Sequence, residues 1–247
     1  MTAPNTLYMT QIRIKPEALM AFARDHDHHK PHDDDLGYTA HAWLAAMFGQ
    51  LAPAPFRIFP PKGRSAAHPS WKILAYTTSP MDTLMEHASM YATPTTMAVT
   101  EAGYIAQKTM PGIIPKGKEV AFESMVCPVT RVGAAEKDVY LRRVETSGEG
   151  PPPSRLEAYL QWLHGRLEGA ATMKNVSLQS FRLARMTRKN HPGGDEPRAA
   201  KSLVFPQAVL SGQLRVENEA AFMRLLARGL GRHRAFGYGM ILLRPPR

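Results

Sequence analysis

The stretch AVLSGQLRVENEAAFMRLLARGLGRHRAFGYGMILL, residues 208–243, carries the clearest structural pattern in the chain. Apolar and mostly polar residues alternate from Ala208 to Val216, which predicts a half-buried strand. Asn218 is a favourable N-cap for a short amphipathic helix that ends at Gly229. A glycine-rich loop then leads into a last apolar strand, Met240–Leu243. The stretch therefore predicts a strand–helix–strand unit.

The residues before this stretch supply the other elements of a small α+β domain. The pattern Ser154-Arg-Leu-Glu157 is a capping box and predicts the start of a helix that continues to Leu167. Strand-like segments lie on both sides of this helix. They are Val120–Val132, its partner Asp138–Val144 after a turn at Gly133, and Val176–Thr187. The polar segment Arg188–Ala200 predicts a loop.

The first half of the chain shows the same order of elements. Its predicted strands are Leu7–Ile14, Phe56–Phe59, Trp71–Thr77 and Tyr104–Thr109. Its predicted helices are Leu36–Phe48, with Asp34 or Asp35 as N-cap, and Met81–Ala92, which starts after Ser79-Pro80. A polar insertion follows Lys15-Pro16, and Pro60–Pro69 predicts a polar loop.

The order β-α-β-β-α-β therefore occurs twice. It predicts an α+β fold of two tandem ferredoxin-like (RRM-like) domains, residues 1–113 and 114–247, joined near Pro111–Lys118. The halves show no residue-level repeat, so the order of elements carries this prediction. Such domains have an open antiparallel sheet face, which RNA-binding modules commonly use.

Composition and charge narrow the class of partner. The chain has 247 residues and 44% of them are apolar, which is enough for a sizeable core. Lys and Arg number 31 against 21 Asp and Glu, so the formal net charge is +10. This balance favours a polyanionic partner, most often nucleic acid, and leaves an ordinary basic enzyme as the alternative.

The cysteine content and the apolar runs exclude other classes. A single cysteine, Cys127, excludes an intramolecular disulfide, and its apolar surroundings predict a buried residue and not a nucleophile. No apolar run is long enough to span a membrane, and the N-terminus does not resemble a secretory signal. We expect a cytoplasmic protein with no membrane partner.

Tyr38 and His41 are the candidate catalytic residues. They lie three positions apart in the first turns of a predicted helix, so their side chains share one face. The partial positive charge of a helix N-terminus favours a neutral imidazole, which is a base near neutral pH. Such a pair suits general acid–base chemistry on a phosphodiester. The alternative is that both are partly buried and continue a stripe with Ala45 and Phe48.

The loop between the last helix and the last strand is the candidate phosphate-binding segment. Its glycines permit positive φ angles and close approach of backbone N–H groups to an anion. Its two arginines add guanidinium donors suited to phosphate. These residues are Gly229, Gly231, Arg232, Arg234, Gly237 and Gly239. It is not a Walker loop, because it lacks the Gly-Lys-Ser/Thr ending. The alternative is a flexible surface turn.

The segment His26–Asp35 is the densest cluster of metal-ligand residue types in the chain. His28, His32 and the aspartates of the segment could bind zinc or nickel adventitiously. Pro31 breaks helical spacing, however, and no second cluster matches it. A solvated loop is therefore the favoured interpretation, and we expect no metal site.

Tyr38-x-x-His41 and the ending Gly-Leu-Gly-Arg-x-x-Ala-Phe-Gly-Tyr-Gly at residues 229–239 occur together in one family. With them the chain resembles CasE, the CRISPR RNA-processing endoribonuclease of type I-E systems. Supporting segments are Leu7-Tyr-Met-Thr, residues 48–57 and residues 122–129, so the resemblance spans essentially the whole chain. The glycine-rich ending is specific to the wider family, and the Tyr-x-x-His pair to this branch.

The resemblance implies that two ferredoxin-like domains bind a CRISPR repeat RNA hairpin and cut it at its 3′ base without metal or other cofactor. It implies that His41 and Tyr38 carry the chemistry and that the glycine-rich loop supports RNA binding and packing. It also implies other subunits of the type I-E effector complex as partners. The candidates to neutralise the negative charge that develops on the scissile phosphate during cleavage are Lys116, Lys118 and Arg131.

The sequence departs from the family pattern at the long His/Asp-rich segment and after Pro128, where Arg131 leaves open which cation approaches the scissile phosphate. Two other functions stay open. A non-catalytic RNA-binding subunit would need neither Tyr38 nor His41. A metal-dependent nuclease would use His26–Asp35.

Overall fold

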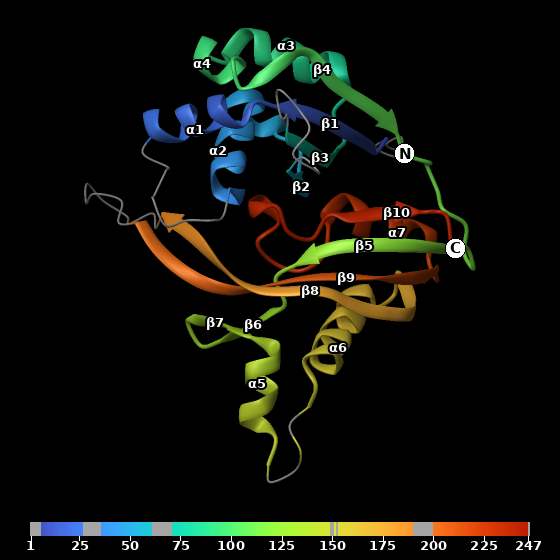
Figure 1. The fold of residues 1–247 in the computed structure, drawn as a ribbon. Helices are drawn as coiled ribbons and strands as arrows, with labels where there is room; N and C mark the ends of the chain where they lie inside the picture. The colour runs from blue at the N-terminus through green and yellow to red at the C-terminus, as the bar shows by residue number, and fades with distance from the viewer. Residues whose placement is uncertain are drawn as a thin grey trace. The chain divides into compact units, whose positions relative to one another are not determined.

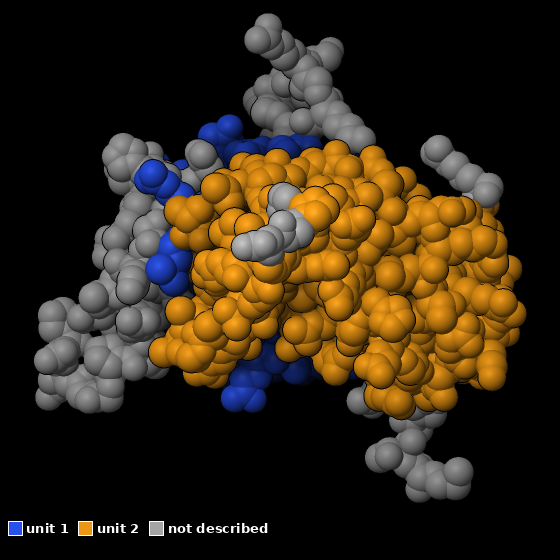
Figure 2. Space-filling view, turned by 90° about the horizontal axis from the view of Figure 1, so that it is seen from below, with its two compact units in different colours: residues 1–112, 185–203, 235–237 blue, residues 113–184, 204–234, 238–247 orange. Residues whose placement is uncertain are grey.

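The computed structural model describes residues 6–26, 36–60, 71–148, 151, 153–189 and 200–246 (Figure 1). The chain divides into two compact units, which Figure 2 shows in different colours. Unit 1 comprises residues 1–112, 185–203 and 235–237, and unit 2 comprises residues 113–184, 204–234 and 238–247. The uninterrupted domains 1–113 and 114–247 stay a prediction.

The sheet of unit 1 has four antiparallel strands. They are β1 (Tyr8–Ile14), β2 (Phe56–Phe59), β3 (Trp71–Thr77) and β4 (Thr100–Thr109). Their order is β2-β3-β1-β4, so β1 pairs with both β3 and β4. Ile12 lies opposite Ile73 on one side and Ile105 on the other. This register places apolar side chains of neighbouring strands on the same sheet face.

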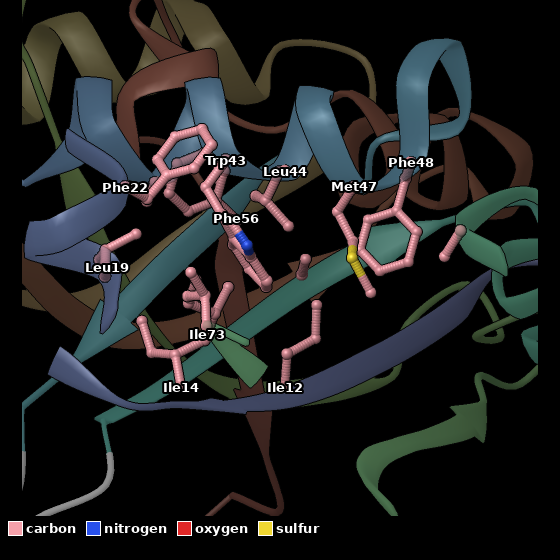
Figure 3. Packing of buried hydrophobic residues seen from close by; sticks show 14 of the residues in the cluster. Ile12, Ile14, Leu19, Phe22, Trp43, Leu44, Met47, Phe48, Phe56 and Ile73 are labelled. Atoms are coloured by element: carbon pink, nitrogen blue, oxygen red, sulfur yellow. The ribbon is translucent and has the colours of Figure 1, made fainter. Parts of the chain in front are cut away.

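The helical layer of unit 1 closes the core over this sheet. Its helices are α1 (Pro16–Asp25), α2 (Gly37–Phe48), the 3₁₀ turn η1 (Gly49–Leu51), α3 (Met81–Tyr91) and α4 (Pro94–Met97). Trp43, Leu44, Met47 and Phe48 of α2 pack in one cluster with Ile12 and Ile14 of β1 and Ile73 of β3 (Figure 3). The indole N–H of Trp43 donates to the Thr96 carbonyl at 3.0 Å. The apolar face of α2 is therefore held in one orientation.

The sheet of unit 2 is built the same way. Its strands are β5 (Glu119–Val126), β8 (Ala171–Lys189), β9 (Ala200–Val216) and β10 (Ile241–Arg244), in the order β10-β5-β9-β8. Its main helices are α6 (Arg155–Leu167) and α7 (Glu219–Arg228), and a 3₁₀ turn η2 (Arg234–Phe236) precedes β10.

The predicted α+β fold of two tandem ferredoxin-like modules is confirmed. In each sheet the strands, counted along the chain, lie in the order 2-3-1-4. In each, helices follow the first and the third strand. The caps predicted for the two main helices of the second half are also present. Ser154 and Glu157 form the capping box of α6, Asn218 accepts from the N–H of Ala221, and Gly229 is the C-cap of α7. Cys127 is buried, as predicted.

Two predictions between β5 and α6 are wrong. The single strand Val120–Val132 ends at Val126, and β6 (Val129–Val132) instead forms a two-stranded sheet with β7 (Ala135–Asp138). Pro128 lies at the break, where its missing N–H stops the ladder. The predicted partner strand Asp138–Val144 is mostly the helix α5 (Val139–Thr146). The carboxylate of Asp138 accepts from the N–H of Tyr140 at 2.9 Å and so caps this helix.

Asp138 also joins this insertion to α6. Arg155 Nη1 donates to its Oδ2 at 2.6 Å, and the Tyr159 hydroxyl donates to the same oxygen at 3.1 Å. The Arg155 guanidinium lies 4.1 Å from the ring centroid of Tyr140 and 3.9 Å from that of Phe181. The cation is therefore paired with a carboxylate and stacked on two aromatic rings.

Other boundaries differ from the predictions in the first half and at the long hairpin. The polar insertion after Lys15-Pro16 contains α1, in which Leu19, Phe22 and Ala23 are buried. The N-cap of α2 is Leu36, without a side-chain cap, so neither Asp34 nor Asp35 takes that position; both lie outside the described residues. The helix α4 was not predicted. β8 and β9 extend into the predicted loop Arg188–Ala200, whose residues 190–199 are not described.

Candidate active site

The helix α2 positions the candidate catalytic pair in unit 1. Ala40, Trp43, Leu44 and Met47 form its fully buried stripe, at helical spacing, and fix how the helix rotates over the sheet. Tyr38 and His41 flank this stripe and are both half-buried. The described geometry thus presents a phenol and an imidazole from one face of a well-anchored helix.

The alternative, that Tyr38 and His41 are partly buried and continue a stripe with Ala45 and Phe48, agrees with the partial burial of both side chains but not with the exposure of Ala45. Ala45, one turn after His41, is exposed, and Phe48 is fully buried. The face therefore meets solvent at Ala45 before it enters the core. His41 itself is half-buried, so part of its side chain is exposed.

Phe236 completes this group and was not predicted as a site residue. Its ring centroid lies 6.0 Å from that of Tyr38 in a stacked arrangement, with 28° between the ring planes. It lies 5.7 Å from that of His41, with 82° between the planes. These are favourable offset and edge-to-face geometries. The signal in the sequence was an aromatic residue inside the glycine-rich loop.

Burial sets the protonation of His41. It lowers the pKa of the imidazole from its ordinary value of 6.5, because desolvation penalises the charged ring. The sequence predicted the same neutral form from the helix N-terminus, whereas the structure attributes it to burial. His41 is therefore neutral near neutral pH and able to accept a proton.

The glycine-rich loop uses several of its backbone donors within the protein. The Gly229 N–H donates to the Leu225 carbonyl at 2.7 Å, the Leu230 N–H to the Gly239 carbonyl at 2.8 Å, and the Gly239 N–H to the Met125 carbonyl at 2.7 Å. These donors are occupied in this structure. Phosphate binding by the loop stays a prediction.

Close packing explains why glycine occupies two of these positions. A Cβ at Gly231 would lie 2.6 Å from Cζ2 of Trp162, and one at Gly239 would lie 2.2 Å from the Leu230 carbonyl oxygen. Both residues also have positive φ, 71° and 80°. The packing role that the family resemblance implies is the one that the contacts support.

The cationic side chains of the loop also have partners in the protein. Arg232 forms an ion pair with Glu136, and His233 Nε2 lies 2.6 Å from the other oxygen of that carboxylate. Arg234 Nη1 donates to the Arg228 carbonyl at 2.8 Å. Burial, and then the neighbouring Arg228 charge, lower the pKa of Arg234. An RNA phosphate would have to share these side chains with their present partners.

The three other candidate cations lie in unit 2 and are exposed. Arg131 is in β6, where its Nε donates to the Gly133 carbonyl at 3.1 Å. Lys116 and Lys118 lie in the turn before β5. The Lys116 backbone N–H donates to the carboxylate of Glu219 at 3.0 Å, and the Lys116 side chain is exposed. The structure thus groups the two lysines in one turn and places Arg131 in a different element.

Most of the His/Asp-rich segment lies outside the described residues, which include only His26 of it. His26 stacks on Phe22 at 4.2 Å between ring centroids, and its Nδ1 lies 2.9 Å from the Phe22 carbonyl oxygen. Across the described part of the chain, no three His, Cys, Asp or Glu residues gather as a metal site. Within the same residues, no helix is long and apolar enough to cross a membrane.

Residues 7–245 match the family model described as CRISPR associated protein. The chain belongs to this family. No curated protein matches the chain significantly.

Solved structures of CRISPR proteins share the fold of this family member. It is similar to a CRISPR endoribonuclease Cse3 bound to a 19-nucleotide RNA, with 18% identity, a TM-score of 0.62 and coverage of 96% of this chain and 100% of the other. It is also similar to Cas6e from Escherichia coli K-12, with 19% identity, a TM-score of 0.56 and coverage of 97% and 100%. A chain of a CRISPR RNA-guided surveillance complex matches with 14% identity, a TM-score of 0.55 and coverage of 97% and 100%.

Proposed function

We propose that the protein is a metal-independent endoribonuclease that binds a CRISPR repeat hairpin and cleaves precursor CRISPR RNA at the 3′ base of the hairpin. The observation that carries the proposal is the pair Tyr38 and His41, a phenol and an imidazole of lowered pKa on one face of α2. Membership of the CRISPR family and the similarity to an endoribonuclease bound to RNA support it.

The reaction needs two proton transfers and no external nucleophile. The 2′-hydroxyl upstream of the scissile phosphate attacks phosphorus, the new 2′-O–P bond forms, and the P–O5′ bond breaks. The products carry a 2′,3′-cyclic phosphate and a 5′-hydroxyl. Neutral His41 is suited to accept the 2′-OH proton, or, once protonated, to donate to the leaving 5′-oxygen. Tyr38 orients the nucleophile or makes the complementary transfer.

Cations would stabilise the charge that develops on the phosphorane. Arg131, Lys116 and Lys118 are the candidates, and their exposed side chains are consistent with an electrostatic role towards RNA. The formal net charge of +10 supports the same class of ligand. We further propose other subunits of a type I-E effector complex as partners, as the similarity to a surveillance-complex chain suggests, and a cytoplasmic location.

One experiment separates this chemistry from metal-dependent cleavage and from simple RNA binding. The purified protein is incubated in excess EDTA with the host's CRISPR repeat RNA and with the same RNA carrying a 2′-deoxy nucleotide immediately before the cut. We expect cleavage of the first RNA only, with both bound, because the deoxy RNA lacks the attacking oxygen but keeps other contacts.

Two results would contradict the proposal. Cleavage of the deoxy RNA, or inhibition by EDTA that magnesium or zinc reverses, would favour a metal-bound water and direct attention to His26–Asp35. Tight binding of both RNAs without any cleavage would favour a non-catalytic RNA-binding subunit.

A further inference from the structure

Phe236 contacts both members of the candidate catalytic pair. It belongs to unit 1 through the short segment 235–237, far in sequence from α2. Its ring stacks on Tyr38 and meets His41 nearly at a right angle, at 6.0 Å and 5.7 Å between centroids. One aromatic side chain therefore limits the orientations open to two others.

The backbone beside Phe236 is itself held in place. Phe236 ends the 3₁₀ turn η2, and the next residue, Gly237, has a positive φ of 87°. A Cβ at Gly237 would lie 3.4 Å from the ring of Phe56, which is fully buried under α2. The positive φ explains glycine after Phe236, since a Cβ there would make only an ordinary van der Waals contact. The 3₁₀ turn before Phe236 and the left-handed residue after it define the backbone position from which the ring projects.

Filling the main core does not account for Phe236. The cluster that joins α2 to the sheet of unit 1 contains neither Phe236 nor the catalytic pair. Phe236 is half-buried, as are Tyr38 and His41. Two of its ring contacts are with the side chains that the proposed chemistry needs.

We propose that Phe236 is a positioning residue, whose ring holds the Tyr38 phenol and the His41 imidazole in the mutual orientation that one phosphodiester requires. This inference rests on the proposed function. It assigns the glycine-rich loop a task besides packing and RNA contact, because glycines on both sides of Phe236 let the chain carry an aromatic ring to α2. Phe236 itself transfers no proton.

The test combines kinetics with a titration that needs no cleavage. Phe236→Leu removes the ring, Phe236→Tyr retains it, and Phe59→Leu is the matched control. Phe59 is another half-buried phenylalanine of unit 1, and its ring lies under Arg57 and Lys72. Single-turnover cleavage, RNA affinity and the NMR titration of His41 in RNA-free protein are measured for each. The His41 signal is assigned with His41→Ala.

We expect Phe236→Leu to cleave about 10 to 10² times more slowly, the usual effect of a small misplacement of reacting groups. RNA affinity should stay within about threefold, since phosphate contacts dominate it. The pKa of His41 should rise towards its ordinary value, because the ring no longer shields it. Phe236→Tyr and Phe59→Leu should match the unaltered protein in all three measurements.

Three outcomes would overturn the inference. The first is an unchanged rate and an unchanged His41 titration in Phe236→Leu. The second is a slower rate explained wholly by weaker RNA binding, which would make Phe236 an RNA contact. The third is an equal loss in Phe236→Tyr. If Phe236→Leu unfolds, Phe236→Met keeps side-chain volume and undergoes the same measurements. If the unaltered protein cuts no RNA, the proposed function fails, while the titration still decides whether Phe236 sets the environment of His41.

Discussion

At the scale of single residues, His41 is defined by its surroundings. The structure adds to the Tyr-x-x-His motif the partial burial of the imidazole and the aromatic ring beside it. Since burial disfavours its charged form, His41 can act as the proposed base only where the bound RNA stabilises the proton that it accepts. Anionic phosphate near the imidazolium is suited to that task.

His41→Ala should slow single-turnover cleavage by about 10²–10⁴, the usual contribution of one acid–base group. RNA affinity should hardly change, because the imidazole is neutral in the free protein and contributes little charge to phosphate binding. His164→Ala is the control, since His164 is exposed on α6 of unit 2. Near-normal cleavage by His41→Ala would remove this residue from the mechanism.

The pH dependence of single-turnover kcat/KM reports the free protein. If neutral His41 is the base, the rate rises with pH through its pKa and is level above it. Because burial lowers that pKa below 6.5, the inflection should lie below the ordinary histidine value. A rate that instead falls as the pH rises through this pKa, with the fall lost in His41→Ala, would indicate that His41 acts in its protonated form as the acid.

At the scale of elements, local patterns predicted what local interactions determine. The capping box at Ser154 and the cap at Asn218 satisfy helix N-termini from within a few residues, so the sequence shows them directly. The alternation before Val216 likewise reflects one buried sheet face. The caps need only neighbouring residues, and the alternation requires only that one face of β9 is buried, whichever distant strand pairs with it.

Elements that depend on tertiary packing were mispredicted. The strand formers Val139, Tyr140 and Leu141 suggested a strand, yet a cap at Asp138 and packing beside α6 make them helical. The prediction of a polar insertion after Pro16 overlooked the apolar Leu19 and Phe22, which are buried in α1. The contact of Phe236 with α2 could not be predicted, because no sequence period relates residues so far apart.

The glycines of the loop make a prediction at this scale. Gly239→Ala should destabilise the protein much more than Gly133→Ala. Both have positive φ, so both cost about 1–2 kcal/mol of backbone strain. Only at Gly239 does the new Cβ meet a backbone oxygen, at 2.2 Å, whereas nothing lies within 4 Å at Gly133. Overpacking adds about 1–3 kcal/mol. Urea unfolding monitored by circular dichroism measures the difference, and equal midpoints would contradict this account.

At the scale of the whole molecule, the formal net charge of +10 predicts an anionic ligand. It specifies a class of ligand and not a site. In the candidate loop Arg232 is paired with Glu136, and Arg234 is bonded to a carbonyl group. Exposed cations elsewhere, such as Lys116 and Lys118, are consequently the better candidates for phosphate contacts.

The salt dependence of hairpin binding tests this comparison. Lys116→Ala combined with Lys118→Ala should flatten the slope of log K against log salt by about 0.7–0.9 per lost phosphate contact. Arg232→Ala should flatten it less, because its charge is already balanced by Glu136. The matched control is Lys174→Ala, which removes an exposed lysine paired with Glu119. The reverse ranking would place the RNA backbone at the glycine-rich loop.

The carboxylate of Asp138 determines which parts of unit 2 unfold together in local fluctuations. One oxygen of this side chain receives both Arg155 and Tyr159 from α6, while the other caps α5. The hairpin β6–β7 ends at the same residue. Fraying of α5 alone would leave a buried negative charge with a lost partner, so the inserted segment and the start of α6 should exchange their amide hydrogens as one cooperative group. The inserted segment of β6, β7 and α5 is therefore expected to unfold together with the start of α6, and not as an independent unit.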